Sequence, residues 1–275
     1  MGSSGRSAEI SGARHLASRL RAESLQSRDI LRRTDEASVR PLLPDVTVVK
    51  VGGASILDRG PEALLPVICE LGELSADHSL LITAGEGARA RHAYEIATDL
   101  GLPTGMLSIL GNSVSGQNAQ IISALMMDRG AVNVPISLVP TLLNGGAPVV
   151  MSGMPPFEWW EPPPSAGHTP QYRTDAGSFL VAEGFGCRRV IYVKDQDGLY
   201  ERDPATAAAA ALIPEISASA LFARHLPALP LEPVVVEMLV NARSVRHVQL
   251  VNGLTPGAVT RAVRGEPVGT VITAG

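Results

Sequence analysis

The sequence predicts a three-layer αβα sandwich around a central, mostly parallel sheet. From Leu43 onward, short apolar runs alternate with longer segments of helical periodicity, which is the pattern of parallel β/α units. The apolar runs are rich in β-branched residues, as expected of strands covered on both faces. With 275 residues, 45% of them hydrophobic, the chain is long enough for one large α/β domain or two modest ones.

Each element follows from a local signal. We expect about seven strands, the clearest of which cover residues 46–50, 79–83, 148–151, 189–193, 245–251 and 268–273. Helices are expected at 61–74, 113–129, 174–185 and 232–243, before Leu100, and between the last two strands. Pro61 suits the first turn of its helix, whereas Pro66 should kink that helix or shift its start. The run Ala205–Ala211 is low in complexity and is expected on the surface.

Residues 1–40 differ in charge from the rest of the chain. They carry 8 arginines against 5 acidic residues, whereas residues 41–275 carry 15 basic residues against 22 acidic ones. The shift predicts a boundary between an N-terminal arm and one domain over residues 41–275. The arm either packs on a neighbouring subunit or is a disordered or cloning-derived extension.

Composition disfavours several classes of protein. A net charge of −4 argues against a broad nucleic-acid interface. No apolar stretch reaches the length of about 18 residues that a membrane span needs. The first residues contain no apolar segment of the kind found in secretory signals, so we expect no such signal. Cys69 and Cys187 are too few for a disulfide framework, which favours a cytoplasmic protein.

The basic residues are 21 arginines and only two lysines, Lys50 and Lys194. Lys50 ends the first expected strand and is followed by Gly52 and Gly53. Parallel sheets bind ligands beyond the carboxyl ends of their strands, where glycines let N–H groups approach an anion and a lysine supplies positive charge. The motif predicts a phosphate contact, although glycines here also serve turn geometry alone.

A second glycine loop follows the second expected strand. It contains Gly85 and Gly87, with Arg89 and Arg91 near the N-terminus of the next helix. These residues predict a further anion cradle at a helix N-terminus. The alternative is a tight strand-to-helix turn with solvated arginines.

Lys194 opens a polar segment after a buried strand. The segment contains Asp195, Asp197, Gly198, Tyr200, Asp203 and Pro204. A lysine with two carboxylates at a strand end suits a magnesium–phosphate pair, although an acidic β-turn also explains Asp197-Gly198. Asp175 begins another expected helix, where it either caps the helix or orients the two lysines.

In their order and spacing, the motifs K-x-G-G, G-x-G, T-D-A and K-x-x-D-G-x-Y-x-x-D-P resemble the amino-acid kinase superfamily, most closely its uridylate-kinase-like branch. The resemblance implies that Lys50 and Lys194 neutralise a transferred phosphoryl group and that Asp175 organises them. It also implies that ATP, with Mg²⁺, lies over residues 173–275, whereas residues 41–172 form the lobe that carries the glycine loops.

Further motifs, among them Gly87–His92, Tyr172–Gly177 and Val251–Leu254, are similar to the molybdenum-storage branch of this family, most of all to its β-type subunits. This likeness covers residues 42–275. It implies an ATP-dependent cage of three α-type and three β-type subunits that encloses polynuclear molybdenum or tungsten oxide clusters. Molybdate is a tetrahedral dianion like phosphate, so a phosphate-handling fold suits it.

Two features depart from the family pattern. Glu86 puts a negative charge where a nucleotide phosphate would lie, which argues against ordinary nucleoside-monophosphate phosphorylation unless the side chain points to solvent. The insertion at residues 151–172 holds 6 of the 21 prolines and both tryptophans. It either lines the cage or contacts a subunit, or it is a stiff surface loop. His168 and Gln117 are candidate cluster contacts, but no histidine pair has the i,i+4 spacing of a metal site.

The leading hypothesis is therefore a storage subunit that binds MgATP and hydrolyses it to support metalate uptake or condensation. The alternative is a uridylate-kinase-like enzyme that transfers the γ-phosphoryl group of ATP to a small acceptor. A third hypothesis is a nucleotide-binding scaffold without enzymatic activity.

Overall fold

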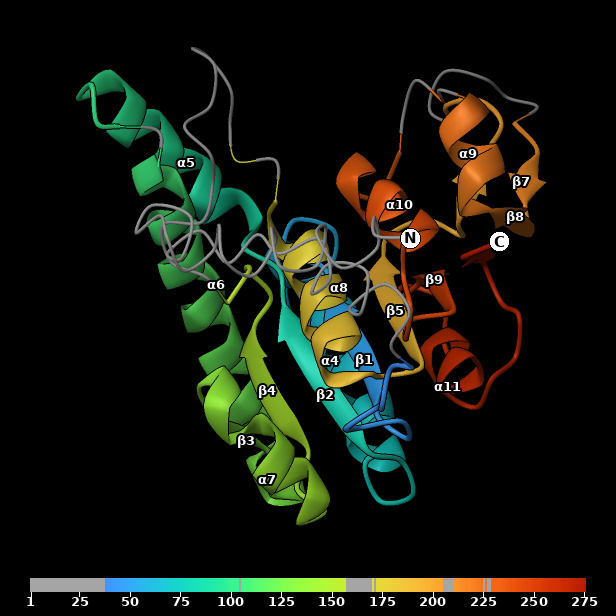
Figure 1. The fold of residues 1–275 in the computed structure, drawn as a ribbon. Coiled ribbons are helices and arrows are strands. Elements are labelled where there is room, and N and C mark those ends of the chain that lie inside the picture. The colour runs from blue at the N-terminus through green and yellow to red at the C-terminus, as the bar shows by residue number, and fades with distance from the viewer. Residues whose placement is uncertain are drawn as a thin grey trace, which may run out of the picture. The chain divides into compact units, whose positions relative to one another are not determined.

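The computed structural model describes residues 38–103, 105–156, 170, 172–204, 210–224, 226 and 229–275. Residues Pro41–Gly275 form one compact unit (Figure 1). The proposed N-terminal arm before residue 38, most of the 151–172 insertion including His168, and residues 205–209 of the alanine-rich run lie outside the described residues.

An eight-stranded sheet forms the centre of this unit, with the spatial order β3-β4-β2-β1-β5-β9-β10-β8. Its strands are β1 (Thr47–Val51), β2 (Leu80–Ala84), β3 (Val132–Asn133), β4 (Val149–Ser152), β5 (Arg189–Lys194), β8 (Glu215–Ser217), β9 (His247–Asn252) and β10 (Thr270–Thr273). Within this described sheet, β9 and β10 pair antiparallel and all other neighbours pair parallel. The predicted mostly parallel sheet is confirmed.

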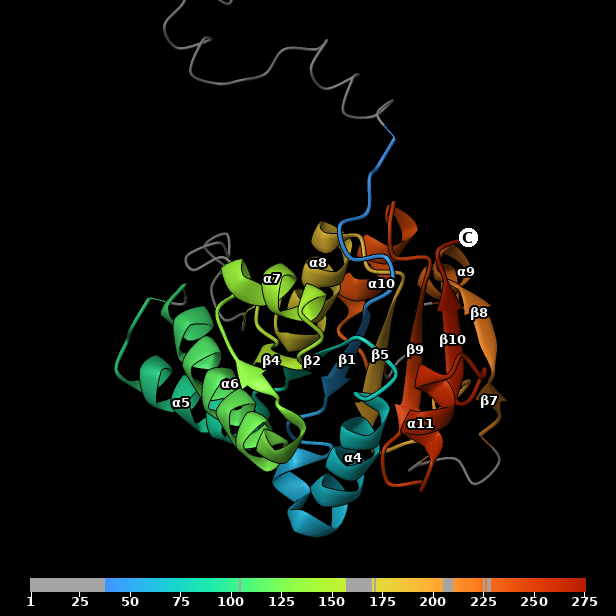
Figure 2. The same cartoon turned by 90° about the horizontal axis from the view of Figure 1, so that it is seen from below.

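Helices cover both faces of the sheet, which makes the three layers seen in Figure 2. One core lies under α4 (Pro61–Leu74), α6 (Gly105–Leu125) and α11 (Ala258–Val263). The other lies under α7 (Val139–Asn144), α8 (Thr174–Phe185), α9 (Ala218–Arg224) and α10 (Pro233–Val240). α5 (Gly87–Asp99) packs along α6. A hairpin of β6 (Leu199–Tyr200) and β7 (Leu212–Ile213) and the short 3-10 turns η1 (Leu57–Arg59), η2 (Met127–Arg129) and η3 (Ile136–Leu138) complete the unit.

The alternation of side chains along the central strands places both lysines on one face. Val48 belongs to the core under α8, and Val49 belongs to the core under α4. Because side chains alternate along a strand, Lys50 lies on the α8 face, and so does Lys194, two residues after Tyr192. β1 and β5 are parallel neighbours with Lys50 opposite Tyr192, so the lysines lie at the carboxyl ends of adjacent strands.

Both predicted ends of the helix expected over residues 113–129 are wrong. α6 begins at Gly105 rather than at residue 113, because its first turns pack on α5 through Leu107 and Tyr94 and lack the sheet-facing pattern. It ends at Leu125 instead of 129, and Gly130, with φ of 73°, closes the turn that follows.

The helix expected over residues 232–243 covers only Pro233–Val240. The carboxylate of Glu183 accepts hydrogen bonds from the N–H groups of Arg243, Ser244 and Val245, which holds these residues outside the helix. α4 runs through Pro66 without a break in its assigned span. In the part of the chain that the structure describes, no helix is both long and apolar enough to cross a membrane.

Candidate functional site

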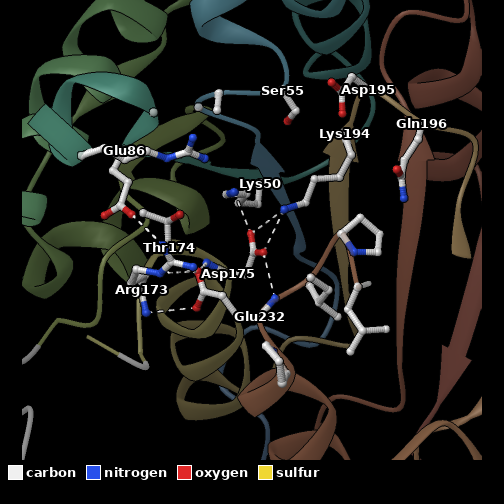
Figure 3. Close-up of a pocket in the computed structure, with 18 residues that line it drawn as sticks. Lys50, Ser55, Glu86, Arg173, Thr174, Asp175, Lys194, Asp195, Gln196 and Glu232 are labelled. Carbon is white, nitrogen blue, oxygen red and sulfur yellow. Dashed lines mark hydrogen bonds and ion pairs between the residues drawn. The ribbon is translucent and has the colours of Figure 1, made fainter. Parts of the chain in front are cut away.

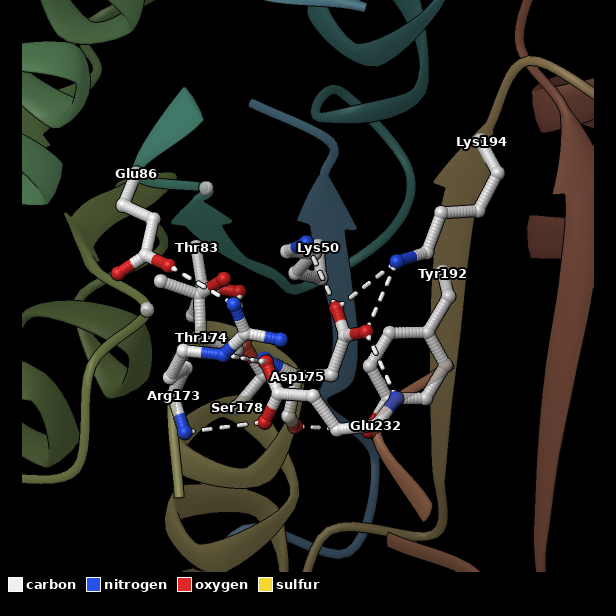
Figure 4. A network of polar contacts seen from close by, with 12 residues as sticks. Lys50, Thr83, Glu86, Arg173, Thr174, Asp175, Ser178, Tyr192, Lys194 and Glu232 are labelled. Carbon is white, nitrogen blue, oxygen red and sulfur yellow. Dashed lines mark hydrogen bonds and ion pairs between the residues drawn. The ribbon is translucent and has the colours of Figure 1, made fainter. Parts of the chain in front are cut away.

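Lys50, Asp175 and Lys194 form one buried ion-pair network at the carboxyl ends of β1 and β5 (Figure 4). Nζ of Lys50 lies 2.6 Å from Oδ1 of Asp175, and Nζ of Lys194 lies 2.8 Å from Oδ2. Lys50 and Asp175 are each 4% exposed and Lys194 is 9% exposed. The fold therefore brings together three residues that belong to three separate motifs of the sequence.

Burial and charge act in opposite directions on this network. Burial alone would raise the pKa of Asp175, but the ammonium groups of Lys194 and Lys50 hold that pKa well below its usual range. Burial lowers the pKa of Lys194, and the Asp175 carboxylate opposes this shift. Two ammonium groups share one carboxylate, so the network favours an additional anion.

Glu232 positions Asp175 by holding the N-terminus of α8. Its carboxylate accepts hydrogen bonds of 3.0 Å from the N–H groups of Arg173, Asp175 and Ala176. An anion at a helix N-terminus is stabilised by the unpaired N–H groups and the helix dipole. The N–H group of Glu232 in turn donates to Oδ2 of Asp175 at 3.3 Å. Burial, followed by the charge of Asp175, raises the pKa of Glu232 to about 7, and Arg173 acts against this shift.

Small and polar residues let α8 lie close to the sheet. The hydroxyl of Tyr192 donates to the carbonyl oxygen of Asp175 at 2.9 Å, and Oγ atoms of Thr83 and Ser178 are 2.7 Å apart. A Cβ on Gly177 would lie 2.1 Å from the carbonyl oxygen of Gly153. These contacts fix the height of Asp175 above the strand ends.

The network lines a cavity of about 440 Å³, shown in Figure 3. Its volume lies within the range of about 300–1,000 Å³ that is typical of small-molecule sites. Four cationic side chains and four carboxylates line it: Lys50, Arg91, Arg173 and Lys194, and Glu86, Asp175, Asp195 and Glu232. The cavity is polar and its lining charges balance.

The loop after β1 presents backbone donors to this cavity. Gly53, Ala54 and Ser55 line it, and within the described ranges their N–H groups have no hydrogen-bond acceptor. Gly52 packs against Val193, whose carbonyl oxygen would lie 2.8 Å from an added Cβ. The predicted phosphate contact of this loop is therefore sterically available.

The loop after β2 differs from the predicted anion cradle. Gly85 and Gly87 pack against Gly53, and of the two arginines only Arg91 is among the described residues that line the cavity. Arg89 turns to α6, where it donates to Gln117 at 3.1 Å and also to Asn118. Gln117, a candidate cluster contact, thus binds an arginine of its own chain.

Glu86 does not point to solvent. It is 8% exposed and lines the cavity. Its Oε2 accepts a hydrogen bond of 2.8 Å from the Tyr94 hydroxyl, and its Oε1 lies 3.7 Å from Nη1 of Arg173. Burial raises the pKa of Glu86, whereas the Tyr94 hydrogen bond and Arg173 lower it.

The polar segment after Lys194 is divided among three cavities. Asp195 lines the first cavity and accepts a hydrogen bond of 3.1 Å from Nε of Arg59. Asp197 lines a cavity of about 310 Å³ and accepts from Nδ2 of Asn252 at 2.8 Å.

Tyr200, Asp203 and Pro204 line a cavity of about 130 Å³, which shares Gln196 and Pro230 with the first one. The backbone of Gly198 packs closely on Thr270, because a Cβ on Gly198 would lie 2.3 Å from Oγ1 of Thr270.

Two charged residues of the site were not predicted from the sequence. Arg173 precedes the T-D-A motif directly, and Glu232 precedes Pro233 at the start of α10. From the sequence, an acidic residue directly before a helix-initiating proline is expected to cap the helix that the proline begins. Only the fold shows that Glu232 caps α8 instead.

Comparisons with known proteins agree with the fold. The model of the amino acid kinase family matches residues 45–252. The molybdenum storage protein subunit beta of Azotobacter vinelandii is 49% identical over 236 residues, which cover 85% of this chain and 87% of the relative. The uridylate kinase of Hyperthermus butylicus is 29% identical, over 82% of this chain and 97% of the relative.

A solved structure shows the same fold. The uridylate kinase of Archaeoglobus fulgidus is 24% identical and matches with a TM-score of 0.65, over 82% of this chain and 99% of that chain. Family match, sequence identity and fold lead to one conclusion. The chain belongs to the amino acid kinase family.

Proposed function

We propose that this chain is a β-type subunit of a molybdenum-storage assembly and binds ATP in the cavity of Lys50 and Lys194. A relative of that name is 49% identical over most of both chains. The observation that carries the nucleotide proposal is the pair of buried ammonium groups on either side of Asp175. Phosphoryl chemistry needs charge neutralisation and positioning above all, and this pair offers both.

The phosphates of ATP are proposed to lie between Lys194 and the donors of Gly53–Ser55. Each free N–H group there gains an acceptor, and each ammonium gains a second anion besides Asp175. The rest of the nucleotide is proposed to lie against the segment that follows Lys194, from Asp195 to Pro204.

Magnesium fits this site as an ion that arrives with the nucleotide. Among the described residues, no group of three or more His, Cys, Asp or Glu side chains could hold a metal ion. Mg²⁺ usually takes one or two carboxylates and completes its coordination with phosphate oxygens and water, a role that Asp195 on the cavity wall suits. When bound, Mg²⁺ neutralises charge on the phosphates.

Molybdate or tungstate is the proposed cargo, and ATP hydrolysis is proposed to support its uptake or condensation in the cytoplasm. The storage relative is a beta subunit, which supports a companion α-type chain here as well. An assembly of three chains of each type, with His168 and Gln117 as cluster contacts, completes the proposal.

The test is purification of the chain with an α-type partner from cells fed molybdate, followed by measurement of bound metal by mass spectrometry. We expect many molybdenum atoms per assembly and ATP hydrolysis by the purified protein. Absence of metal together with ATP-dependent UMP phosphorylation would establish the uridylate-kinase alternative. Nucleotide binding without ATP hydrolysis, phosphoryl transfer or bound metal would support the scaffold alternative.

A further inference from the structure

The two glycine loops that frame the cavity differ in what they offer an anion. The loop after β1 leaves the N–H groups of Gly53–Ser55 without acceptors among the described residues. The N-terminus of α5, which follows the loop after β2, already holds a carboxylate, because Oδ2 of Asp58 accepts a hydrogen bond of 2.5 Å from the N–H group of Ala88. A Cβ on Gly87 would lie 2.5 Å from that same oxygen.

Glu86 adds a second negative charge on this side. In Figure 4, Glu86 and Lys194 lie on opposite sides of Asp175. The Glu86 carboxylate is fixed by Tyr94, and Gly111 makes room for both, since a Cβ there would lie 2.2 Å from the Tyr94 hydroxyl. The charge therefore faces the cavity from a defined position.

Arg173, one of the two arginines among the described residues that line the cavity, is shared between two carboxylates. Its Nη1 lies 3.7 Å from Oε1 of Glu86, and its Nε lies 3.9 Å from Oε1 of Glu232. A cation paired in this way offers little attraction to an incoming anion. On the α5 side, two carboxylates, Glu86 and Asp58, therefore stand beside Arg173, which is already paired, and Arg91, which lines the cavity from α5.

We propose that Glu86 and Asp58 exclude a phosphate-bearing second substrate from the α5 side of the cavity. This inference rests on the proposed function and deepens it. If ATP binds in the cavity, the excluded phosphate leaves no nucleoside monophosphate beside ATP to accept its γ-phosphoryl group. Replacement of Glu86 by a neutral residue removes one carboxylate, leaves Arg173 paired with Glu232 alone and gives the cavity lining a net positive charge.

The experiment measures UMP binding by calorimetry at pH 8 for the wild type and for Glu86→Gln. Glu86→Asp keeps the charge, and Glu95→Gln removes an exposed glutamate of the same helix that lies outside the cavity lining. We expect Glu86→Gln to raise UMP affinity about tenfold or more, Glu86→Asp to raise it less because the charge remains, and Glu95→Gln to leave it unchanged. Melting temperatures verify that each variant is folded.

Equal UMP affinity in folded Glu86→Gln and wild type would overturn the inference. A wild-type protein that binds UMP more tightly than uridine would also overturn it, and this comparison needs no variant. ATP affinity is measured in parallel. If the wild type does not bind ATP but Glu86→Gln gains UMP affinity, the proposed function is rejected. The exclusion of UMP by Glu86 is then still supported.

Discussion

Gly53 and Gly85 lie backbone against backbone. A Cβ on Gly85 would come within 2.2 Å of the nitrogen of Gly53, and a Cβ on Gly53 would come within 2.2 Å of the nitrogen of Gly87. The loops that follow β1 and β2 therefore pack directly on each other, and both contribute residues to the cavity that Lys50 and Glu86 line.

Gly53→Ala is expected to force these loops apart. Overpacking of this kind costs about 1–3 kcal/mol of stability, and the shifted N–H groups should weaken ATP binding. Chemical denaturation and calorimetry measure the two effects. Gly116→Ala on α6 is the matched control, because no atom lies within 4 Å of the added Cβ. In a helix interior that change should stabilise the protein by about 0.5–1 kcal/mol. Equal behaviour of the two variants would contradict the packing argument.

Lys194→Ala is expected to remove one of the two phosphate-neutralising ammonium groups without unfolding the chain. Loss of one preorganised donor lowers turnover by about 100-fold in comparable sites, so ATP affinity or hydrolysis should fall strongly. Calorimetry, a phosphate-release assay and thermal melting follow the variant. Arg264→Ala, at an exposed position outside the cavity lining, serves as control. Unchanged affinity and hydrolysis in Lys194→Ala would remove this lysine from the mechanism.

Asp175→Asn is expected to destabilise the protein, because two buried ammonium groups then lose their shared counter-ion. Breaking a buried ion pair costs about 3–5 kcal/mol, measurable by urea denaturation. Asp128→Asn is the control, since its side chain is 73% exposed where it meets Arg129 and surface pairs contribute at most about 1 kcal/mol. A loss no larger than that of the control would show that the lysines are neutral in the folded protein.

Glu232 is expected to make the unfolding free energy depend on pH. Its pKa is raised from 4.5 to about 7 in the folded protein, so the folded state binds more protons than the unfolded state between these values. This contribution to stability is therefore complete below about pH 4.5 and is lost as the pH rises to about 7.

Chemical denaturation of the wild type and of Glu232→Gln from pH 5 to pH 8 measures this contribution. The variant should show a flatter dependence, whatever its absolute stability. Parallel curves for the two proteins would mean that Glu232 does not titrate in this interval.

The sequence was most informative where a residue's position depends on its own segment. β-branched runs predicted the central strands, with Lys50 at the end of one strand and Lys194 directly after another. α8 was predicted over the residues that it occupies. The short strands β3 and β8 contain two and three residues, too few for any periodicity to register.

Features that depend on distant partners could not be predicted in the same way. Glu232 lies 57 residues from Asp175 in the chain and yet controls its helix. Whether Glu86 faces solvent or the cavity depends on the space that Gly111 leaves on α6. Arg89 carries a charge suited to an anion, but its direction is set by Gln117 and Asn118.

The scarcity of lysine has a practical consequence for the buried pair. Lys50 and Lys194 hold every side-chain amine of this protein, and both line the same cavity. A small amine-reactive reagent therefore modifies, apart from the chain's terminal amine, only this cavity. A decrease in its mass increment when a ligand is added reports protection of these two amines, so the unaltered protein carries its own probe.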